Sequence, residues 1–181
     1  MPGEQKTIGI ISTMDTKGEE CAFLKNQIEK HGHKTLIIDV GVMGEPRIKT
    51  DITREEIAKA GGEELPDLQE AAKAGSDRAE ATEVMIEGVE ELLANAYKDG
   101  RLHAMVGLGG STGSSIAIEA MRALPQEAPK LLLTTVADLQ DVDDEDGIAV
   151  LQTPCDIMGL NSILKNTLSQ AAGAIAGIME T

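Results

Sequence analysis

The stretch His103-Ala-Met-Val-Gly-Leu-Gly-Gly-Ser-Thr-Gly-Ser-Ser115 decides the fold of this chain. Its first part, His103–Leu108, is a short apolar run that predicts a buried strand. A glycine-rich turn follows at Gly109–Ser115, and Ser115–Leu124 has the spacing of a helix that stops before Pro125. A buried strand that enters a helix through a tight glycine turn is typical of parallel α/β proteins.

The rest of the chain repeats this alternation of apolar runs and helical patterns. We expect strands at Thr7–Ser12, Lys34–Val40, Lys130–Val136 and Ile148–Leu151, and helices at Glu20–His31, Thr53–Ala60, Asp67–Ala74, from Ser76 or Asp77 to Lys98, and at Leu160–Met179. Because the strands are apolar on both faces, we predict an α/β fold with a doubly wound, mostly parallel five-stranded sheet. The expected architecture is Rossmann-like or flavodoxin-like, with strand order 2-1-3-4-5, helices on both faces and a single domain over residues 1–181.

Composition narrows the classes of partner. The net charge of −15 argues against binding to a nucleic-acid backbone or an anionic membrane surface, because both need a positive face. No apolar stretch is long enough to cross a bilayer, and the first residues do not resemble a signal peptide. Two cysteines far apart in the chain fit no metal or disulfide pattern, so we expect a cytoplasmic protein.

The glycine-rich turn is the best candidate for a phosphate site. Glycines let backbone N–H groups approach an anion, and the positive end of the next helix points to the same place. The hydroxyl groups of Ser111, Thr112, Ser114 and Ser115 add donors. The run is neither a Walker loop nor a GxGxxG motif, since no Gly-Lys-Ser/Thr follows and Thr112 replaces the third glycine. A tight turn that merely needs its glycines is the alternative.

Three more side chains are expected at the same edge of the sheet. Lys17 could meet a phosphate as a point charge, and Asp15 could orient a hydroxyl or hold Mg²⁺ through water. The alternative makes Asp15 or Thr16 a helix cap and Lys17 a solvated residue. Asp39, at the end of the second strand, could bind a ribose hydroxyl or cap the next loop.

The acidic run Asp138–Asp146 holds six carboxylates and no cation. If this run lay beside a bound phosphate, its carboxylates would repel the phosphate unless a metal ion such as Mg²⁺ lay between them. Alternatively, the run is a solvated loop without a binding role. The sequence offers no convincing catalytic triad, and its three histidines lie at element ends, where we expect surface or capping roles. Whether the protein is an enzyme stays open.

Several motifs together resemble a known family. Gly107–Ser115, Thr134-Thr-Val-Ala137, Asp156-Ile-Met-Gly-Leu-Asn161, Gly9–Lys17 and Ala171–Gly177 occur in the same order in the N-terminal ATP-binding domain of the tomato mosaic virus resistance protein-like family. The resemblance covers nearly the whole chain. It implies an ATP-binding, Rossmann-like domain that forms a homodimer, with ATP as cofactor and Mg²⁺ as a companion ion.

The resemblance also implies positions for the nucleotide. By motif, the family's ATP-contacting segments correspond to Asp15, Thr16, Lys17, Gly109, Gly110, Ser111, Thr112, Gly113 and Thr135. In the usual family member a second domain follows, so we expect either that this sequence is one piece of a longer protein or that a separate chain carries the second domain and is a partner. The chain departs from the family at Asp141–Gly147, where relatives tend to have a Tyr-Val-Gly-like stretch, and nucleotide binding could be weaker or altered as a result.

Three functional hypotheses follow. The first is an ATP-binding domain that forms one half of a two-part enzyme or assembly. The second is a non-catalytic regulatory or interaction module that dimerises through the small-residue helix Ala171–Gly177. The third is the subunit of an enzyme that binds a small phosphate or carboxylate in the same crevice.

Overall fold

The computed structural model describes residues 5–75, 78–137, 139 and 142–180. It contains one five-stranded sheet, with the order β2-β1-β3-β4-β5 and every neighbouring pair parallel. The strands are β1 (Thr7–Ser12), β2 (Lys34–Asp39), β3 (Ala104–Gly109), β4 (Lys130–Thr134) and β5 (Ile148–Gln152). The predicted fold class and strand order are therefore confirmed.

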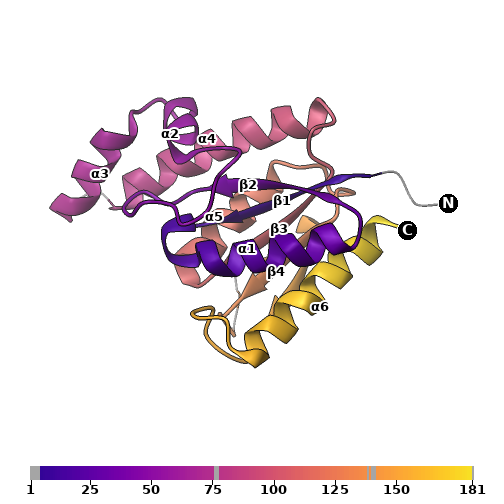
Figure 1. Cartoon of the computed structure of the whole chain (residues 1–181). Coiled ribbons are helices and arrows are strands. Elements are labelled where there is room, and N and C mark those ends of the chain that lie inside the picture. The colour runs from indigo at the N-terminus through magenta and orange to yellow at the C-terminus, as the bar shows by residue number, and fades with distance from the viewer. Residues whose placement is uncertain (1–4, 76–77, 138, 140–141, 181) are drawn as a thin grey trace.

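Helices cover both faces of the sheet (Figure 1). The helices are α1 (Met14–Lys30), α2 (Arg54–Ala60), α3 (Leu65–Ala74), α4 (Arg78–Lys98), α5 (Ser111–Arg122), the single 3₁₀ turn η1 (Asp144–Asp146) and α6 (Ser162–Met179). Helices α1 and α6 pack together on one face, while α4 and α5 pack together on the other, with α2 and α3 beside α4. Among the described residues no helix is both long enough and apolar enough to cross a membrane.

The sheet supplies side chains to two separate cores because successive residues of a strand point to opposite faces. In β1, Ile8 and Ile10 join the cluster beneath α1 and α6, whereas Ile11 joins the cluster beneath α4 and α5. All three are fully buried. This two-sided burial explains why the central strands β1, β3 and β4 are apolar on both faces, whereas the edge strand β5 has no buried residue although its sequence is equally apolar.

The strand order creates a switch point between β1 and β3. From β1 the chain passes through α1 to β2 on one side, and from β3 it passes through α5 to β4 on the other. In sheets of this kind, ligands bind in the crevice outside the carboxyl ends of the two strands where the direction reverses. Ser12 joins these two ends, since its hydroxyl donates to the carbonyl of Leu108 at 2.6 Å.

Helices α1 and α5 begin a full turn or more earlier than the sequence pattern predicts. Helix α1 starts at Met14 instead of Glu20, and its first N–H is capped from a distant strand by the carboxylate of Asp39. Helix α5 starts at Ser111 instead of Ser115, because Ser114 already donates its N–H to the carbonyl of Gly110. The proposed caps of the long fourth helix, residues 76 and 77, lie outside the described residues.

Candidate functional site

The carboxyl end of β3 leads directly into the first turn of α5. Gly110 is the N-cap residue, with φ −85° and ψ −153°, and it has no side chain that could cap the helix. The first three N–H groups of a helix, here those of Ser111, Thr112 and Gly113, have no partner within the helix. Among the described residues, no protein group accepts a hydrogen bond from these three amides. The first turn can therefore bind an external anion.

The four glycines of this segment serve two different purposes. A methyl group on Gly107 would lie 2.7 Å from Cβ of Ala117, and one on Gly109 would lie 2.9 Å from Cα of Gly113, so both allow α5 to pack on β3. Gly110 and Gly113 are different, because a methyl group there would meet nothing closer than 3.7 Å and 3.8 Å, respectively. Packing does not require these two glycines, and their absent side chains leave the backbone open to a ligand.

Ser114 is a predicted binding residue that the structure places inside the protein. It is 1% exposed, and its hydroxyl lies 2.7 Å from Oγ1 of Thr134 and donates to the carbonyl of Gly109 at 3.3 Å. The sequence analysis counted it as a ligand donor because it took Gly109–Ser115 to be a turn. With the helix starting at Ser111, position 114 faces the sheet, so this hydroxyl joins β3, α5 and β4 and is directed away from the crevice.

The other hydroxyl groups of the glycine segment lie at the surface. Ser111 and Thr112 are exposed in the first turn of α5. Thr135, just after β4, is half-buried, and the space that a methyl group on Gly110 would take lies 3.7 Å from its Oγ1. These predicted residues therefore share one edge of the sheet with the free amides.

A pocket of about 340 Å³ lies next to this turn. It is lined by Thr13 after β1, residues of the loop after β2, the last part of α3, the first part of α4, and two residues of α5. The lining residues are Thr13, Val40, Val42, Met43, Ala72, Arg78, Ala79, Ala81, Thr82, Met85, Thr112 and Ile116. The pocket thus lies at the switch point, and among the described residues that line it none is Asp or Glu. That is notable in a chain with 31 acidic residues.

Arg78 is the cation of this pocket, and the sequence analysis missed it. The residue is exposed at the first position of α4. It lies about 30 residues before the glycine segment, in the first turn of an expected helix, and nothing in the sequence connects it to that segment. Only the packing of α4 beside α5 brings it to the crevice.

Asp39 is 1% exposed and holds backbone groups together. Its Oδ1 accepts the N–H groups of Met14 at 3.0 Å and of Gly41 at 2.9 Å. Burial raises the pKa of Asp39, while the two amides act in the opposite direction. The structure thus supports the capping alternative for this residue, and its binding to a ribose remains an untested prediction.

Asp15 and Thr16 also hold local structure. Oδ2 of Asp15 accepts the N–H of Gly44 at 3.1 Å, which fastens the loop after β2 onto α1. The hydroxyl of Thr16 lies 2.8 Å from that of Thr13, the N-cap residue of α1. Both residues lie at the expected edge of the sheet.

Lys17 reaches the neighbouring loop. Its Nζ donates to the carbonyl of Ile157 at 2.5 Å, in the segment between β5 and α6. One turn further along α1, Oε1 of Glu20 accepts the N–H of Gly159 at 2.7 Å. Together these two side chains fix that segment to α1, so Lys17 has a structural partner besides any phosphate.

The C-terminal end of the acidic run, at Asp146, is bound by cations from elsewhere in the fold. Arg122 donates from Nε to Oδ1 of Asp146 at 3.0 Å and from Nη2 to Oδ2 at 2.9 Å. Lys130, which is 3% exposed, donates to the carbonyl of Asp146 at 2.9 Å. Residues 138, 140 and 141 of the run lie outside the described residues. Among those described, no group of three or more His, Cys, Asp and Glu side chains could hold a metal ion.

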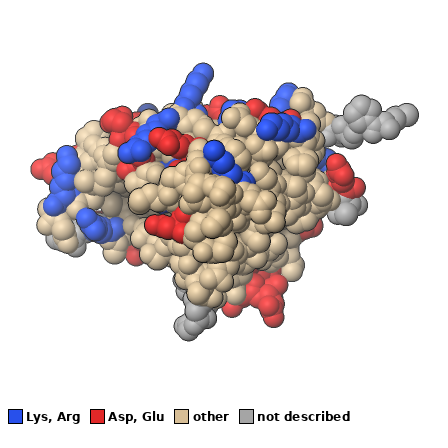
Figure 2. Space-filling view, turned by 60° about the horizontal axis from the view of Figure 1, so that its bottom comes forward, with Lys and Arg blue, Asp and Glu red and all other residues tan. Residues whose placement is uncertain are grey.

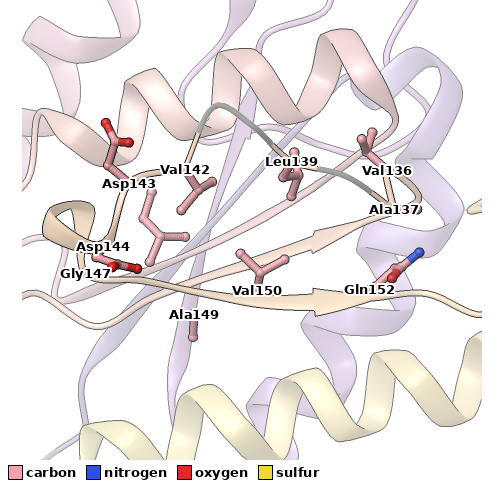
Figure 3. Close-up of a pocket in the computed structure, with 11 residues that line it drawn as sticks. Val136, Ala137, Leu139, Val142, Asp143, Asp144, Gly147, Ala149, Val150 and Gln152 are labelled. Carbon is pink, nitrogen blue, oxygen red and sulfur yellow. The ribbon is translucent and has the colours of Figure 1, made fainter.

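A second pocket, of about 530 Å³, lies along the edge strand β5 (Figure 3). Val150 extends from β5 toward the loop that carries Leu139 and Val142, and Asp143 and Asp144 lie at one end. Its described lining contains two carboxylates and no Lys or Arg. This pocket is therefore unsuited to an anionic ligand.

The small-residue segment of α6 lies mostly inside the protein. Ala171, Ala172 and Ala176 are buried, and α6 packs against α1. The opposite side of the helix is exposed and carries few charges, since Lys165 is the one charged residue within α6. Figure 2 shows a broad area free of charged residues on the side of the molecule where α6 lies.

Comparison with known proteins places the chain in a family. The model of the N-terminal domain of the uncharacterised protein family UPF0261 matches residues 6–181. A UPF0261 protein of Clostridium tetani is 39% identical over 97% of this chain and 43% of its own length. One from Mesorhizobium japonicum is 37% identical over 96% of this chain and 42% of its own length.

A plant protein matches part of the chain. The ToMV susceptible protein tm-1(GCR26) of Solanum lycopersicum is 34% identical over 56% of this chain and 14% of its own length. The chain spans about two fifths of the length of the bacterial relatives. On the match to its N-terminal domain model and on these identities, the chain belongs to the uncharacterised protein family UPF0261.

Proposed function

We propose that this domain binds ATP, with the phosphates at the first turn of α5. The observation that carries the proposal is the set of free amides at Ser111–Gly113, which open at the switch point beside a pocket that has no acidic lining among its described residues. Helix N-termini bind phosphate because their N–H groups and the helix dipole both favour negative charge. The resemblance noted in the sequence supports ATP as the nucleotide.

The surroundings of this turn suit a polyphosphate. Arg78 supplies a positive charge, and the exposed hydroxyls of Ser111 and Thr112 can donate to phosphate oxygens. Mg²⁺ would arrive with the nucleotide, and Asp15 could contact it through water. These groups offset the repulsion between ATP and a chain with a net charge of −15.

The test is a calorimetric titration of the protein with ATP, with and without Mg²⁺. The decisive variant is Gly110→Asp, since a carboxylate at an N-cap accepts the N–H groups of the first turn and also repels phosphate. We expect this variant to fold at least as stably as the natural protein and to bind ATP at least tenfold more weakly, which corresponds to about 1.4 kcal/mol.

A matched control places the same carboxylate on another helix. Thr53 is the N-cap of α2, and its side chain accepts the N–H of Glu56. Thr53→Asp should leave ATP affinity unchanged. Absence of heat from the natural protein at millimolar ATP would overturn the proposal, and so would equal affinities for Gly110→Asp and Thr53→Asp.

Self-association is a second candidate function. We propose that two copies of the chain pack through the exposed side of α6, where Ile163 is 55% exposed and Ile178 is 40% exposed on a surface poor in charge. Light scattering tests this directly. A dimer that Ala174→Glu dissociates is expected, with Glu180→Lys as a charge control at the end of the helix. A monomer at all concentrations would refute it.

Further elements of the proposal concern partners and location. We propose that this domain associates with the remainder of the family's length, and pull-down with the purified second domain tests this association. Cys21 and Cys155 are both free thiols, which supports a reducing, cytoplasmic location. A thermal-shift screen with small phosphates and carboxylates tests the third hypothesis, since a ligand at 100 times its Kd adds about 2.7 kcal/mol to stability.

A further inference from the structure

The loop after β2 is held in place by other parts of the fold. Asp39 and Asp15 accept the N–H groups of Gly41 and Gly44, as described above. Nε2 of Gln69, on α3, donates to the carbonyl of Val42 at 2.9 Å. The loop therefore presents the side chains of Val42 and Met43 on a fixed backbone, although Met43 is 47% exposed.

These side chains line the 340 Å³ pocket together with residues from the first part of α4. The lining is aliphatic, with hydroxyls from Thr13, Thr82 and Thr112 and the guanidinium-bearing Arg78. A preformed apolar hollow of this size with a few polar groups is the usual character of a small-molecule site. Since Thr112 belongs to both the hollow and the first turn of α5, a ligand can occupy both together.

We propose that this pocket holds the base and sugar of a nucleotide whose phosphates lie on the first turn of α5, with Arg78 pairing with the phosphate charge. This inference rests on the proposed function and adds the part of the site that binds the nucleoside. It also assigns Asp15 and Asp39 as positioning residues, because each holds the loop that lines the pocket. Through these contacts both residues contribute to affinity by fixing the shape of the pocket, in addition to the water-mediated contact with Mg²⁺ proposed for Asp15.

The experiment compares ATP with inorganic triphosphate by calorimetry, using variants of two exposed alanines on α4. Ala79 lines the pocket, whereas Ala94 lies further along the same helix and is absent from the lining. We expect Ala79→Trp to weaken ATP binding at least tenfold while triphosphate binding changes less than twofold. Ala94→Trp should change neither.

A second pair of variants tests whether the positive charge of Arg78 pairs with the phosphates. Arg78→Gln should weaken both ligands at least fivefold, and Arg101→Gln, at an exposed surface position, should weaken neither. Because the chain contains no tryptophan, Met43→Trp provides a single tryptophan at the pocket, and its emission can be excited selectively. ATP should shift its emission and triphosphate should not, which gives a measurement that does not depend on the folding of Ala79→Trp.

The outcomes separate this inference from the proposed function. If the natural protein binds ATP and triphosphate equally and Ala79→Trp has no effect, the phosphate site stands and the nucleoside pocket is overturned. If the natural protein binds neither ligand, the proposed function itself fails. Loss of triphosphate binding in Ala79→Trp would also contradict the inference, because that side chain should obstruct only the nucleoside.

Discussion

The contact between α2 and α4 gives a sharp prediction, because two glycines let their backbones touch. A methyl group on Gly88 would lie 1.9 Å from the carbonyl oxygen of Ile57, and one on Gly61 would lie 2.1 Å from that of Val84. Ordinary contact begins at about 3.4 Å, and neither obstacle is a flexible side chain. Gly88→Ala must therefore push the two helices apart.

Two opposing effects set the change in the free energy of unfolding caused by Gly88→Ala. Alanine within a helix is more favourable than glycine by about 1 kcal/mol, whereas overpacking a well-packed core costs about 1–3 kcal/mol. The clash here is with backbone, so the upper part of that range applies, and we expect Gly88→Ala to lower the free energy of unfolding by about 2 kcal/mol. The displaced α4 also carries Arg78, so ATP affinity should fall as well.

The control is the same substitution in α6. Gly173 is also inside a helix, but a methyl group there would lie 3.9 Å from Nε2 of His31, in ordinary contact. Gly173→Ala should therefore stabilise the protein by up to about 1 kcal/mol. Urea denaturation followed by circular dichroism measures both variants. Equal stabilisation by the two substitutions would refute the close backbone approach of α2 and α4.

Three further outcomes are expected. The Arg122 guanidinium lowers the pKa of Asp146 below the ordinary aspartate value of 3.8. The ion pair therefore stabilises the fold fully at pH values above 3.8, and this stabilisation is lost as the pH falls through the lowered pKa. Denaturation of Asp146→Asn should accordingly show a deficit of about 1.5 kcal/mol at pH 7 that shrinks in acid, and a constant deficit would contradict this. Both ring nitrogens of His33 lack hydrogen-bond partners among the residues that the structure describes, although the residue is only 8% exposed. His33→Leu should therefore raise the free energy of unfolding by about 1 kcal/mol, and a thermal melt showing a loss would count against it. ATP hydrolysis by the isolated domain should stay below about 1 s⁻¹. Arg78 is the one Lys or Arg in the described lining of the pocket, and Lys17 already donates to a carbonyl, so few cations remain to stabilise the charge on a transferring phosphoryl group. Phosphate release at about 10 s⁻¹ or faster would disprove this.

Local pattern was sufficient to predict the fold. Apolar runs such as Lys130–Val136 could only be buried strands, and the helical patterns between them required a parallel sheet covered on both faces. The strand order followed from the general preference for right-handed connections. These features depend on periodicity within short segments, which a single sequence displays directly.

The site depended on contacts that the sequence does not display. The glycine segment was located correctly, but the start of α5 at Ser111 turned Ser114 inward. Helix α1 began early because Asp39, 25 residues away, caps it. The expectation of surface or capping roles for all three histidines was wrong for His33, which is buried and whose ring has no hydrogen-bond partner within the described part of the chain.

The sequence by itself determined the parallel α/β sheet and the tight glycine turn between β3 and α5 at Gly110, since strand burial and glycine geometry are properties of neighbouring residues. Only the tertiary structure decided which charges meet that turn. It brought Arg78 to the crevice, engaged Lys17 with Ile157 and paired the acidic run with Arg122. The reason is physical: electrostatic and hydrogen-bond partners are chosen by distance in space, and distance in space is fixed by how helices pack on the sheet.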